Sequence, residues 1–409
     1  MSRGVLALVV FAAVAAAAAG THAQTGLPAG NGKQLVAQSC SRCHGLDRVV
    51  NSGYTHAGWA NVVAMMVNAG AKLSPDQVKT VVDYLAANFP QRTAPAAAIV
   101  PGSVRVTIRE WPLPIAGSRP HDPLAMPDGS IWYTGQMADV LGRLDPRTGA
   151  IKQYPLPPNS GPHGLVADKN GNIWYTANFA GYIGKLDPRT GHVTRYPMPN
   201  PAARDPHTPL FDRHGILWFT VQNGNFVGRL DPATGSIKLV QLPSPHSLPY
   251  GMVIDSKGVP FFAEFGANRI GRIDPATMEI HEYTLPNPEA RPRRIAITSG
   301  DIIWYTDYAR GFLGRFDPAS GNVTEWPSPG GRDSQPYGIA AIHGVIWYSE
   351  SGVEPNTIVR FDPATRRFQT WPIPSGGGVV RNVSPTAEGN LAIACSGVNR
   401  VGLVEIHPP

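Results

Sequence analysis

Short apolar segments repeat along most of this chain at the spacing expected of β-strands. From residue 104 onwards, runs of about five apolar or alternating residues are separated by turn sequences such as Asp168-Lys169-Asn170-Gly171. A Leu-Asp-Pro tripeptide or a close variant recurs about every 43 residues, the length of a four-stranded propeller blade. These tripeptides begin at Leu144, Leu186, Leu230, Ile273, Phe316 and Phe361. This part of the chain is therefore predicted to be an all-β propeller.

The number of repeats predicts seven blades. Six complete units are followed by a degenerate seventh at 375–407, and the sequence contains the 44 glycines and 41 prolines that many tight turns require. Val104 to Leu113 reads as an outer strand without a blade of its own. We expect it to pair with the last repeat, which would close the ring and leave no exposed sheet edge. The predicted propeller spans 104–409.

The N-terminal part has a different periodicity. Between residues 30 and 89 the apolar residues recur at helical spacing, which predicts short helices at 34–43, 59–69 and 74–89. Ser74 followed by Pro75 is a typical helix start. We expect a small all-α domain at 24–90, joined to the propeller by an Ala/Pro-bearing linker at 91–103.

The first residues predict export. Residues 1–23 combine a short basic start, an unbroken run of apolar and small residues, and a small-x-small cleavage site before Gln24. This is the pattern of a signal peptide rather than a membrane anchor, because the apolar run is shorter than the roughly 20 residues that a bilayer requires. No later segment is apolar enough to span a membrane, so we expect a periplasmic or otherwise exported protein.

One motif carries specific chemistry. Cys40 and Cys43 with His44 form C-x-x-C-H, the attachment signature of a c-type haem. The two thiols can form thioethers to the haem vinyl groups, and the histidine ligates the iron. A zinc site would need a second ligand pair, and the only other cysteine is the distant Cys395.

The motif and the predicted helices together resemble a small class I cytochrome c domain. In that family the distal iron ligand is usually a methionine, and this chain offers Met65 and Met66. Met66 shares a helical face with Trp59, and Met65 does not, so Met66 is the predicted ligand. His56 is the alternative, although a surface histidine is its simpler interpretation.

The charge of the chain limits its partners. The net charge of +6 at pH 7 is modest and is spread along the sequence without a basic run. A nucleic-acid partner is therefore not predicted. A redox partner protein or a small-molecule substrate fits the composition.

The repeat also places polar residues around one opening. The innermost strand of a blade starts, and its neighbour ends, at the same face beside the central channel. Consecutive blades supply His121, His163 and His207 at the strand starts, and the next three supply Glu264, Asp307 and Glu350 at the neighbouring strand ends. Such a ring could hold a second metal ion or bind a polar substrate. The alternative is that each histidine is a structural residue repeated by duplication.

The serial Trp-Tyr-Thr, Ile-Gly-Arg-Ile-Asp-Pro and Pro-His-Gly elements resemble the virginiamycin B lyase family of seven-bladed propellers, from Val104 to the end. That resemblance implies a magnesium-assisted elimination with a histidine base. The residues that would carry this chemistry differ here. Arg293 replaces a substrate-binding histidine, while Gln335 and Tyr337 replace a metal-binding glutamate and the base. Glu350 is one position out of register with the other expected carboxylate.

These observations favour an exported c-type haem protein that transfers electrons. Its propeller would bind a substrate or partner, and a small molecule could be oxidised at the channel mouth. Tethering a haem to the propeller raises its effective concentration there, which benefits electron transfer but not a lyase. Two other interpretations stay open: a metal-dependent C–O lyase with an accessory haem, and a non-catalytic propeller platform that carries a cytochrome.

Overall fold

The computed structural model describes residues 26–41, 46–50, 52–68, 71–91 and 93–407. The chain divides into two compact units, Met1–Arg92 and Thr93–Pro409. The predicted signal peptide, and Cys43 and His44 of the C-x-x-C-H motif, lie outside the described residues. No helix in the described part of the chain is long and apolar enough to cross a membrane.

The first unit is helical. It contains α1 (Lys33–Cys40), α2 (Asp47–Val50), α3 (His56–Asn68) and α4 (Pro75–Asn88). Helix α4 starts as its sequence predicts, because the Ser74 side chain accepts a hydrogen bond from the Gln77 amide in a capping box. The helices share one apolar core, which includes Val36, Trp59 and Leu85. This unit therefore has a hydrophobic core of its own.

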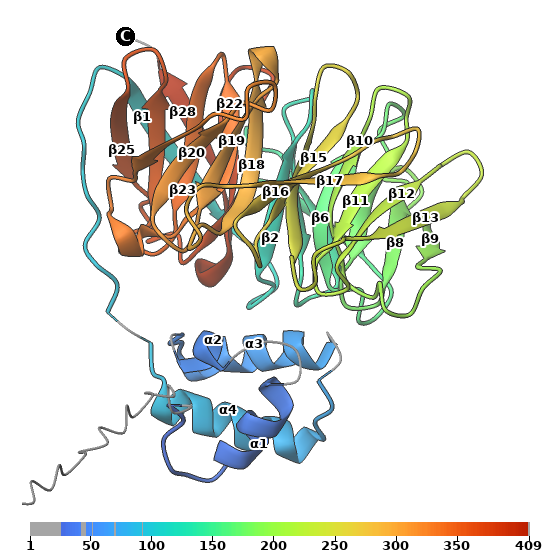
Figure 1. Ribbon diagram of the computed structural model, residues 1–409, viewed down its shortest axis with the longest axis vertical. Coiled ribbons are helices and arrows are strands. Elements are labelled where there is room, and N and C mark those ends of the chain that lie inside the picture. Colours follow the sequence, from blue (N-terminus) through green and yellow to red (C-terminus); the bar gives the residue numbers. More distant parts are fainter. Residues whose placement is uncertain (1–25, 42–45, 51, 69–70, 92, 408–409) are drawn as a thin grey trace, which may run out of the picture. The chain divides into compact units, whose positions relative to one another are not determined.

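The second unit is a ring of seven four-stranded antiparallel sheets (Figure 1). From inner to outer strand, the first four blades are β2 (Pro120–Ala125), β3 (Ile131–Gly135), β4 (Val140–Leu144) and β5 (Ile151–Pro155); β6 (Pro162–Ala167), β7 (Ile173–Ala177), β8 (Tyr182–Leu186) and β9 (Val193–Pro197); β10 (Pro206–Phe211), β11 (Leu217–Val221), β12 (Phe226–Leu230) and β13 (Ile237–Gln241); β14 (Pro249–Ile254), β15 (Pro260–Glu264), β16 (Arg269–Ile273) and β17 (Ile280–Thr284). The last three are β18 (Pro292–Thr298), β19 (Ile302–Asp307), β20 (Phe312–Phe316) and β21 (Val323–Pro327); β22 (Pro336–Ile342), β23 (Val345–Glu350), β24 (Thr357–Asp362) and β25 (Arg367–Pro372); β26 (Val380–Pro385), β27 (Leu391–Cys395), β28 (Arg400–His407) and β1 (Arg105–Pro112). The prediction of a seven-bladed propeller is confirmed.

The ring closes as the sequence predicts. Strand β1 pairs with β28 over its whole length, from Arg105 opposite His407 to Pro112 opposite Arg400. The innermost strands of neighbouring blades contact one another all the way round, including β2 with β26. Residues from both ends of the propeller sequence therefore share one sheet, which removes a free edge.

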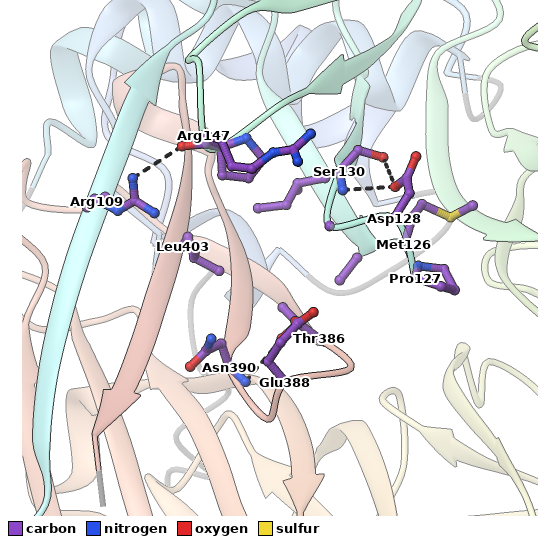
Figure 2. Close-up of a pocket in the computed structure, with 14 residues that line it drawn as sticks. Arg109, Met126, Pro127, Asp128, Ser130, Arg147, Thr386, Glu388, Asn390 and Leu403 are labelled. Carbon is purple, nitrogen blue, oxygen red and sulfur yellow. Dashed lines mark hydrogen bonds between the residues drawn. The ribbon is translucent and has the colours of Figure 1, made fainter.

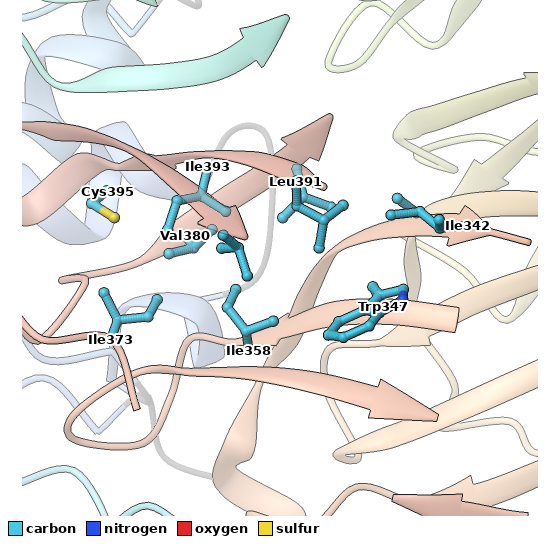
Figure 3. Packing of buried hydrophobic residues seen from close by; sticks show 11 residues of the cluster. Ile342, Trp347, Ile358, Ile373, Val380, Leu391, Ile393 and Cys395 are labelled. Atoms are coloured by element: carbon cyan, nitrogen blue, oxygen red, sulfur yellow. The ribbon is translucent and has the colours of Figure 1, made fainter. Parts of the chain in front are cut away.

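Packing between blades and within a blade accounts for two of the repeated motifs. The repeated tryptophans are almost fully buried: Trp132, Trp174, Trp218, Trp304 and Trp347. Within the first blade, the glycine of Leu141-Gly142-Arg143 lies over an aromatic ring of the neighbouring strand, and a Cβ on Gly142 would lie 2.0 Å from Cζ of Tyr133. Figure 3 shows the cluster between the last two blades, where Trp347, Ile358 and Cys395 pack together. Side-chain complementarity thus repeats with the blade.

The segment just before the propeller packs along its sixth blade. The Glu354 amide donates to the Pro95 carbonyl at 2.9 Å, and the Thr370 amide donates to the Val100 carbonyl at 3.0 Å. We predicted this segment as part of a linker at 91–103. From residue 95 onwards its backbone is attached to the propeller rather than spanning free solvent.

Candidate functional site

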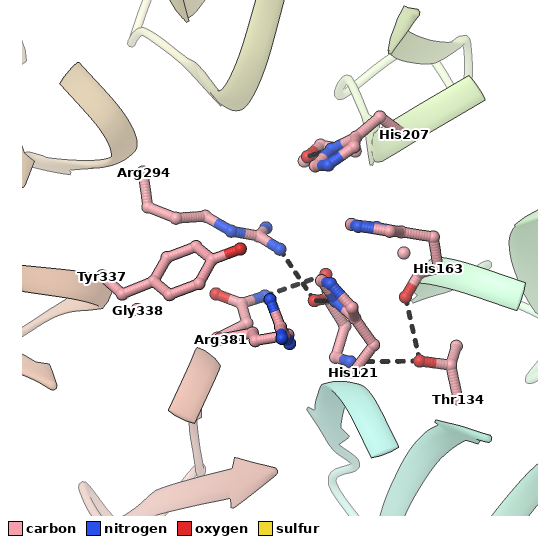
Figure 4. Close-up of polar contacts among 12 residues, drawn as sticks. His121, Thr134, His163, His207, Arg294, Tyr337, Gly338 and Arg381 are labelled. Atoms are coloured by element: carbon pink, nitrogen blue, oxygen red, sulfur yellow. Dashed lines mark hydrogen bonds and ion pairs between the residues drawn. The ribbon is translucent and has the colours of Figure 1, made fainter. Parts of the chain in front are cut away.

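An irregularity at the start of every innermost strand positions the ring residues. In the first blade the ladder pairs Pro120 with Gly135 and then Pro123 with Tyr133, so that His121 and Asp122 are left out of the regular register. The same break follows the first residue of each of the other six innermost strands. A β-bulge redirects side chains in this way. Here it places side chains such as His121 beside the central channel (Figure 4).

In the first, second, third and fifth blades, the threonine of the Trp-Tyr-Thr or Trp-Phe-Thr motif joins the bulge of its own blade to the next blade. The Asp122 amide donates to the Thr134 hydroxyl at 3.0 Å, and that hydroxyl donates to the His163 carbonyl at 2.9 Å. Thr176 makes the same pair of bonds with Gly164 and His207. The motif therefore sets the position of the next ring residue as well as blade packing.

The three predicted histidines do come together. The ring centroids of His121 and His163 are 3.6 Å apart, and those of His163 and His207 are 3.7 Å apart. All three side chains are buried. Burial is the main cause that holds the pKa of each imidazole well below its ordinary value of 6.5. Nearby arginines come next for His121 and His207, whereas for His163 the two neighbouring histidines come next and the arginines after them. The stack is neutral at neutral pH.

A buried ion pair crosses the channel beside the histidines. Arg294 of the fifth blade donates to Asp122 of the first blade at 2.7 Å, and Asn382 of the seventh blade donates to the other oxygen of Asp122 at 3.1 Å. His121 Nδ1 lies 2.8 Å from the Asp122 carboxylate. Burial raises the pKa of Asp122, although Arg294 opposes that effect. Asp122 and Arg294 were not predicted as site residues, although they directly follow His121 and Arg293 in the same irregularities of the ladder.

Aromatic side chains surround Arg293, which occupies in the fifth blade the position that His121 occupies in the first. Its guanidinium carbon lies 3.8 Å from the ring centre of Tyr337, 4.2 Å from that of Tyr308, 4.5 Å from that of Phe265 and 5.0 Å from that of Tyr250. The hydroxyls of Tyr250 and Tyr337 are 2.5 Å apart. These cation–π contacts hold the guanidinium plane in place.

The resemblance implies that Tyr337 and Gln335 stand at the positions of the base and of a metal ligand in the family. Burial raises the pKa of the Tyr337 phenol, but Arg293, Arg381 and Arg294 outweigh that effect and bring the pKa below its ordinary value of 10. Gln335 accepts a hydrogen bond from the Tyr308 hydroxyl at 2.8 Å. A neutral amide thus takes the place of a carboxylate, which weakens the case for a magnesium ion here.

The three predicted carboxylates do not join the histidines, so that part of the predicted ring is wrong. Glu264, Asp307 and Glu350 lie opposite the prolines that precede the ring residues. Asp307 accepts from Arg310 Nε at 2.6 Å, and Glu350 accepts from Thr357 Oγ1 at 2.7 Å. Because the ladder irregularity turns only the ring residues towards the channel, the paired carboxylates make their contacts within and between blades.

Glu264 differs from the other two carboxylates. Its side chain is fully buried, and neither oxygen has a hydrogen bond of ordinary geometry to any described residue. Arg269 Nη1 lies 3.9 Å from one oxygen. Burial and the neighbouring Glu282 raise the pKa of Glu264 to about 7. A carboxyl that is half protonated at neutral pH is a poor metal ligand.

One group could coordinate a metal ion. Among the described residues, only His121, Asp122 and His163 bring three ligand atoms within 4.8 Å of one another. The neutral imidazoles fit a transition metal, and His163 Nδ1 has no hydrogen-bond partner among the residues that the structure describes. Asp122 is already bound to Arg294, however, and the surrounding guanidinium groups repel a cation.

The helical unit holds the remaining candidates. Cys40 is half-buried at the end of α1 and packs against the helical core. Met66 lies on α3 and is half-buried, and the described core includes Val62 and Val67 of that helix but not Met66. His56 is exposed and lies 2.8 Å from Asp83, which agrees with its interpretation as a surface residue.

A separate cavity of about 350 Å³ lies at the outer surface of the propeller, between the first and seventh blades (Figure 2). Arg109, Asp128, Arg147 and Glu388 are among its lining residues. Asp128 is paired with Arg143 at 2.9 Å, and Arg147 with Asp145 at 3.2 Å. Asp128 and Arg147 are therefore already paired, and none of the ring histidines is among the residues that line the cavity.

Comparisons with known proteins agree with the geometry of the propeller. The model of the virginiamycin B lyase family matches residues 96–340. A solved streptogramin B lyase is 28% identical with a TM-score of 0.68, over 74% of this chain and 98% of that chain. A catalytically inactive virginiamycin B lyase from Staphylococcus aureus, solved with quinupristin, is 25% identical with a TM-score of 0.66, over 73% and 99%. No curated protein matches. With the family model covering more than half of its length, the chain belongs to the virginiamycin B lyase family.

Proposed function

We propose that this protein is an exported c-type cytochrome that transfers electrons, and that its lyase-like propeller binds a small-molecule substrate or a redox partner. The observation that carries the proposal is the C-x-x-C-H motif at the end of α1, in a helical unit with its own core.

The residues of this unit suit a haem. Cys40 and Cys43 would hold it through thioethers, His44 would ligate the iron, and Met66 would be the distal ligand. Cys40 already packs against the apolar core, whereas Met66, which is also apolar, is not part of the core as described. When bound, a haem c with His/Met ligation supplies one-electron transfer.

The propeller supports a binding role better than the lyase reaction. Tyr337 stands where the family has its base, and Gln335 and Arg293 replace two further functional residues. Family membership alone does not transfer an activity when these side chains differ. A lyase with an accessory haem is the second candidate, and the fold match is the observation that favours it.

Two measurements on the exported protein test the proposal. The protein is produced with a haem-attachment system, and its spectrum is recorded oxidised, reduced and after denaturation, with Cys43→Ala as control. We expect covalent haem in the natural protein and loss of the two-thioether spectrum in the variant. A protein without covalent haem would refute the electron-transfer function.

The second measurement separates the two candidates. Quinupristin is incubated with the protein and magnesium, with the Staphylococcus aureus lyase as positive control. We expect no ring opening. Turnover that is equal with oxidised and reduced protein and requires magnesium would instead support the lyase.

A further inference from the structure

The mouth of the central channel has more positive charge than its own carboxylates neutralise. Arg293, Arg294 and Arg381 all contribute positive charge at Tyr337. Among them only Arg294 is neutralised, by Asp122 at 2.7 Å. Within the described part of the chain, Arg293 and Arg381 take part in no ion pair, although both are half-buried. A partly desolvated cation without a counter-charge is costly, so an anion would be stabilised here.

The setting of Arg293 selects the shape of that anion. Its guanidinium faces are covered by the rings of Tyr337 and Tyr308, 3.8 and 4.2 Å away. The N–H donors of a guanidinium project in its plane, so the edge is what remains for a ligand. Arg293 Nε is buried and has no hydrogen-bond partner in the described segments of the chain. A planar acceptor with two oxygens, such as a carboxylate, matches a guanidinium edge.

The neighbouring groups also favour an acceptor-only ligand. The hydroxyl of Tyr337 shares a short hydrogen bond with that of Tyr250, and Arg293 Nη2 lies 3.4 Å from the Tyr250 oxygen. Arg381 donates from Nε to the Ser396 hydroxyl at 3.2 Å, which keeps it at the channel. The neutral histidines bring no competing positive or negative charge. Donors therefore outnumber free acceptors at the mouth.

We propose that the mouth of the propeller channel binds a small carboxylate-bearing molecule, which Arg293 and Arg381 hold by their guanidinium groups. This deepens the proposed function and rests on it only in taking the channel as the ligand site of the propeller. The site differs in charge from one built to hold a magnesium ion, because Gln335 and Tyr337 replace acidic and basic family residues there.

Calorimetric titration of the haem-loaded full chain tests the site. Benzoate is the probe, and benzamide, which has the same ring without the charge, is the neutral control. We expect benzoate to bind in low salt, benzamide to bind far more weakly, and added chloride to weaken binding. Arg293→Gln and Arg381→Gln should each weaken benzoate about ten- to a hundredfold, as expected for a lost charge-assisted hydrogen bond.

Arg272→Gln is the matched control, because it removes an exposed arginine of the same propeller and should leave binding unchanged. Thermal unfolding of each variant confirms that it is folded, and Arg381→Gln keeps the test valid if Arg293→Gln does not fold. Equal binding of benzoate and benzamide, or equal losses in all three variants, would overturn the proposal. The haem spectrum of the same samples separates the two hypotheses: haem without benzoate binding refutes this site alone, and benzoate binding without haem refutes the electron-transfer function alone.

Discussion

Glu264 provides a direct test of the electrostatics of the propeller. Its carboxyl is fully buried, and its pKa is raised to about 7 from an ordinary 4.5. Each pKa unit corresponds to about 1.36 kcal/mol, so the ionised carboxylate costs about 3 kcal/mol of folding free energy. Because the folded state holds its proton more tightly than the unfolded state, this cost is absent below about pH 4.5, grows as the pH rises to about 7, and is constant above that.

Glu264→Gln removes the ionisation and keeps the shape of the side chain. Relative to the natural protein, the variant should have nearly the same free energy of unfolding at pH 4.5 and should be more stable by up to about 3 kcal/mol at pH 8. Guanidinium unfolding, followed by tryptophan fluorescence at several pH values, measures this difference. Groups that titrate in both proteins cancel in the comparison.

Glu289→Gln is the control, because Glu289 is exposed and its substitution should change the free energy of unfolding far less than Glu264→Gln does. If Glu264→Gln changes stability by the same amount at both pH values, Glu264 does not titrate near neutrality and the reasoning fails. A variant that is less stable at pH 8 would show that the ionised carboxylate is stabilised by its neighbours, Arg269 above all.

Three further predictions concern single side chains. Tyr337 should ionise below the ordinary tyrosine pKa of 10. In a near-ultraviolet titration of the folded protein, the tyrosine ionisation at lowest pH should be absent from Tyr337→Phe and should move to higher pH in Arg293→Gln. A titration curve that is unchanged in both variants would contradict this. Burial raises the pKa of the Cys395 thiol well above its ordinary value, so a thiol reagent at pH 8 should label it only after unfolding, and labelling of the native protein would show the thiol to be accessible. Thr176→Val should lower stability by about 1–3 kcal/mol because two buried backbone groups lose their partner. The exposed control Thr190→Val should change it by less than about 0.5 kcal/mol. Equal effects of the two substitutions in thermal unfolding would show that the hydrogen bonds of Thr176 do not stabilise the propeller.

The repeat made the propeller predictable. A period of about 43 residues fixes four strands per blade, and the unmatched strand at residue 104 can be satisfied only by closing the ring. The histidines could also be placed, because they occupy one repeat position and the bulge acts on each in the same way. Because the local sequence recurs in these blades, the place of a residue in one blade predicts the place of its equivalents in the others.

The charged part of the site was less predictable. Glu264 pairs with Pro249, one residue before Tyr250, and this offset is enough to separate its side chain from the ring. A shift of one residue along a strand exchanges one face for the other. The rings around Arg293 come from three different blades, so no local sequence pattern indicates them. Contacts across blades depend on where the loops finally lie.

The charge of the channel mouth separates fold from activity in this protein. The family reaction, as the resemblance implies it, needs a metal ion and a base, and both are served by carboxylate and histidine side chains. Here the corresponding positions carry Gln335 and Tyr337, and Arg293 adds a cation that no described carboxylate neutralises. A site that repels a cation and retains a phenol between guanidinium groups is better suited to holding an anion than to polarising an ester with magnesium. The residues that pack the blades and the residues that face the central channel occupy different positions of the repeat. The propeller can therefore keep its packing, its bulges and its threonine hydrogen bonds while the residues at its channel come to suit a ligand of opposite charge.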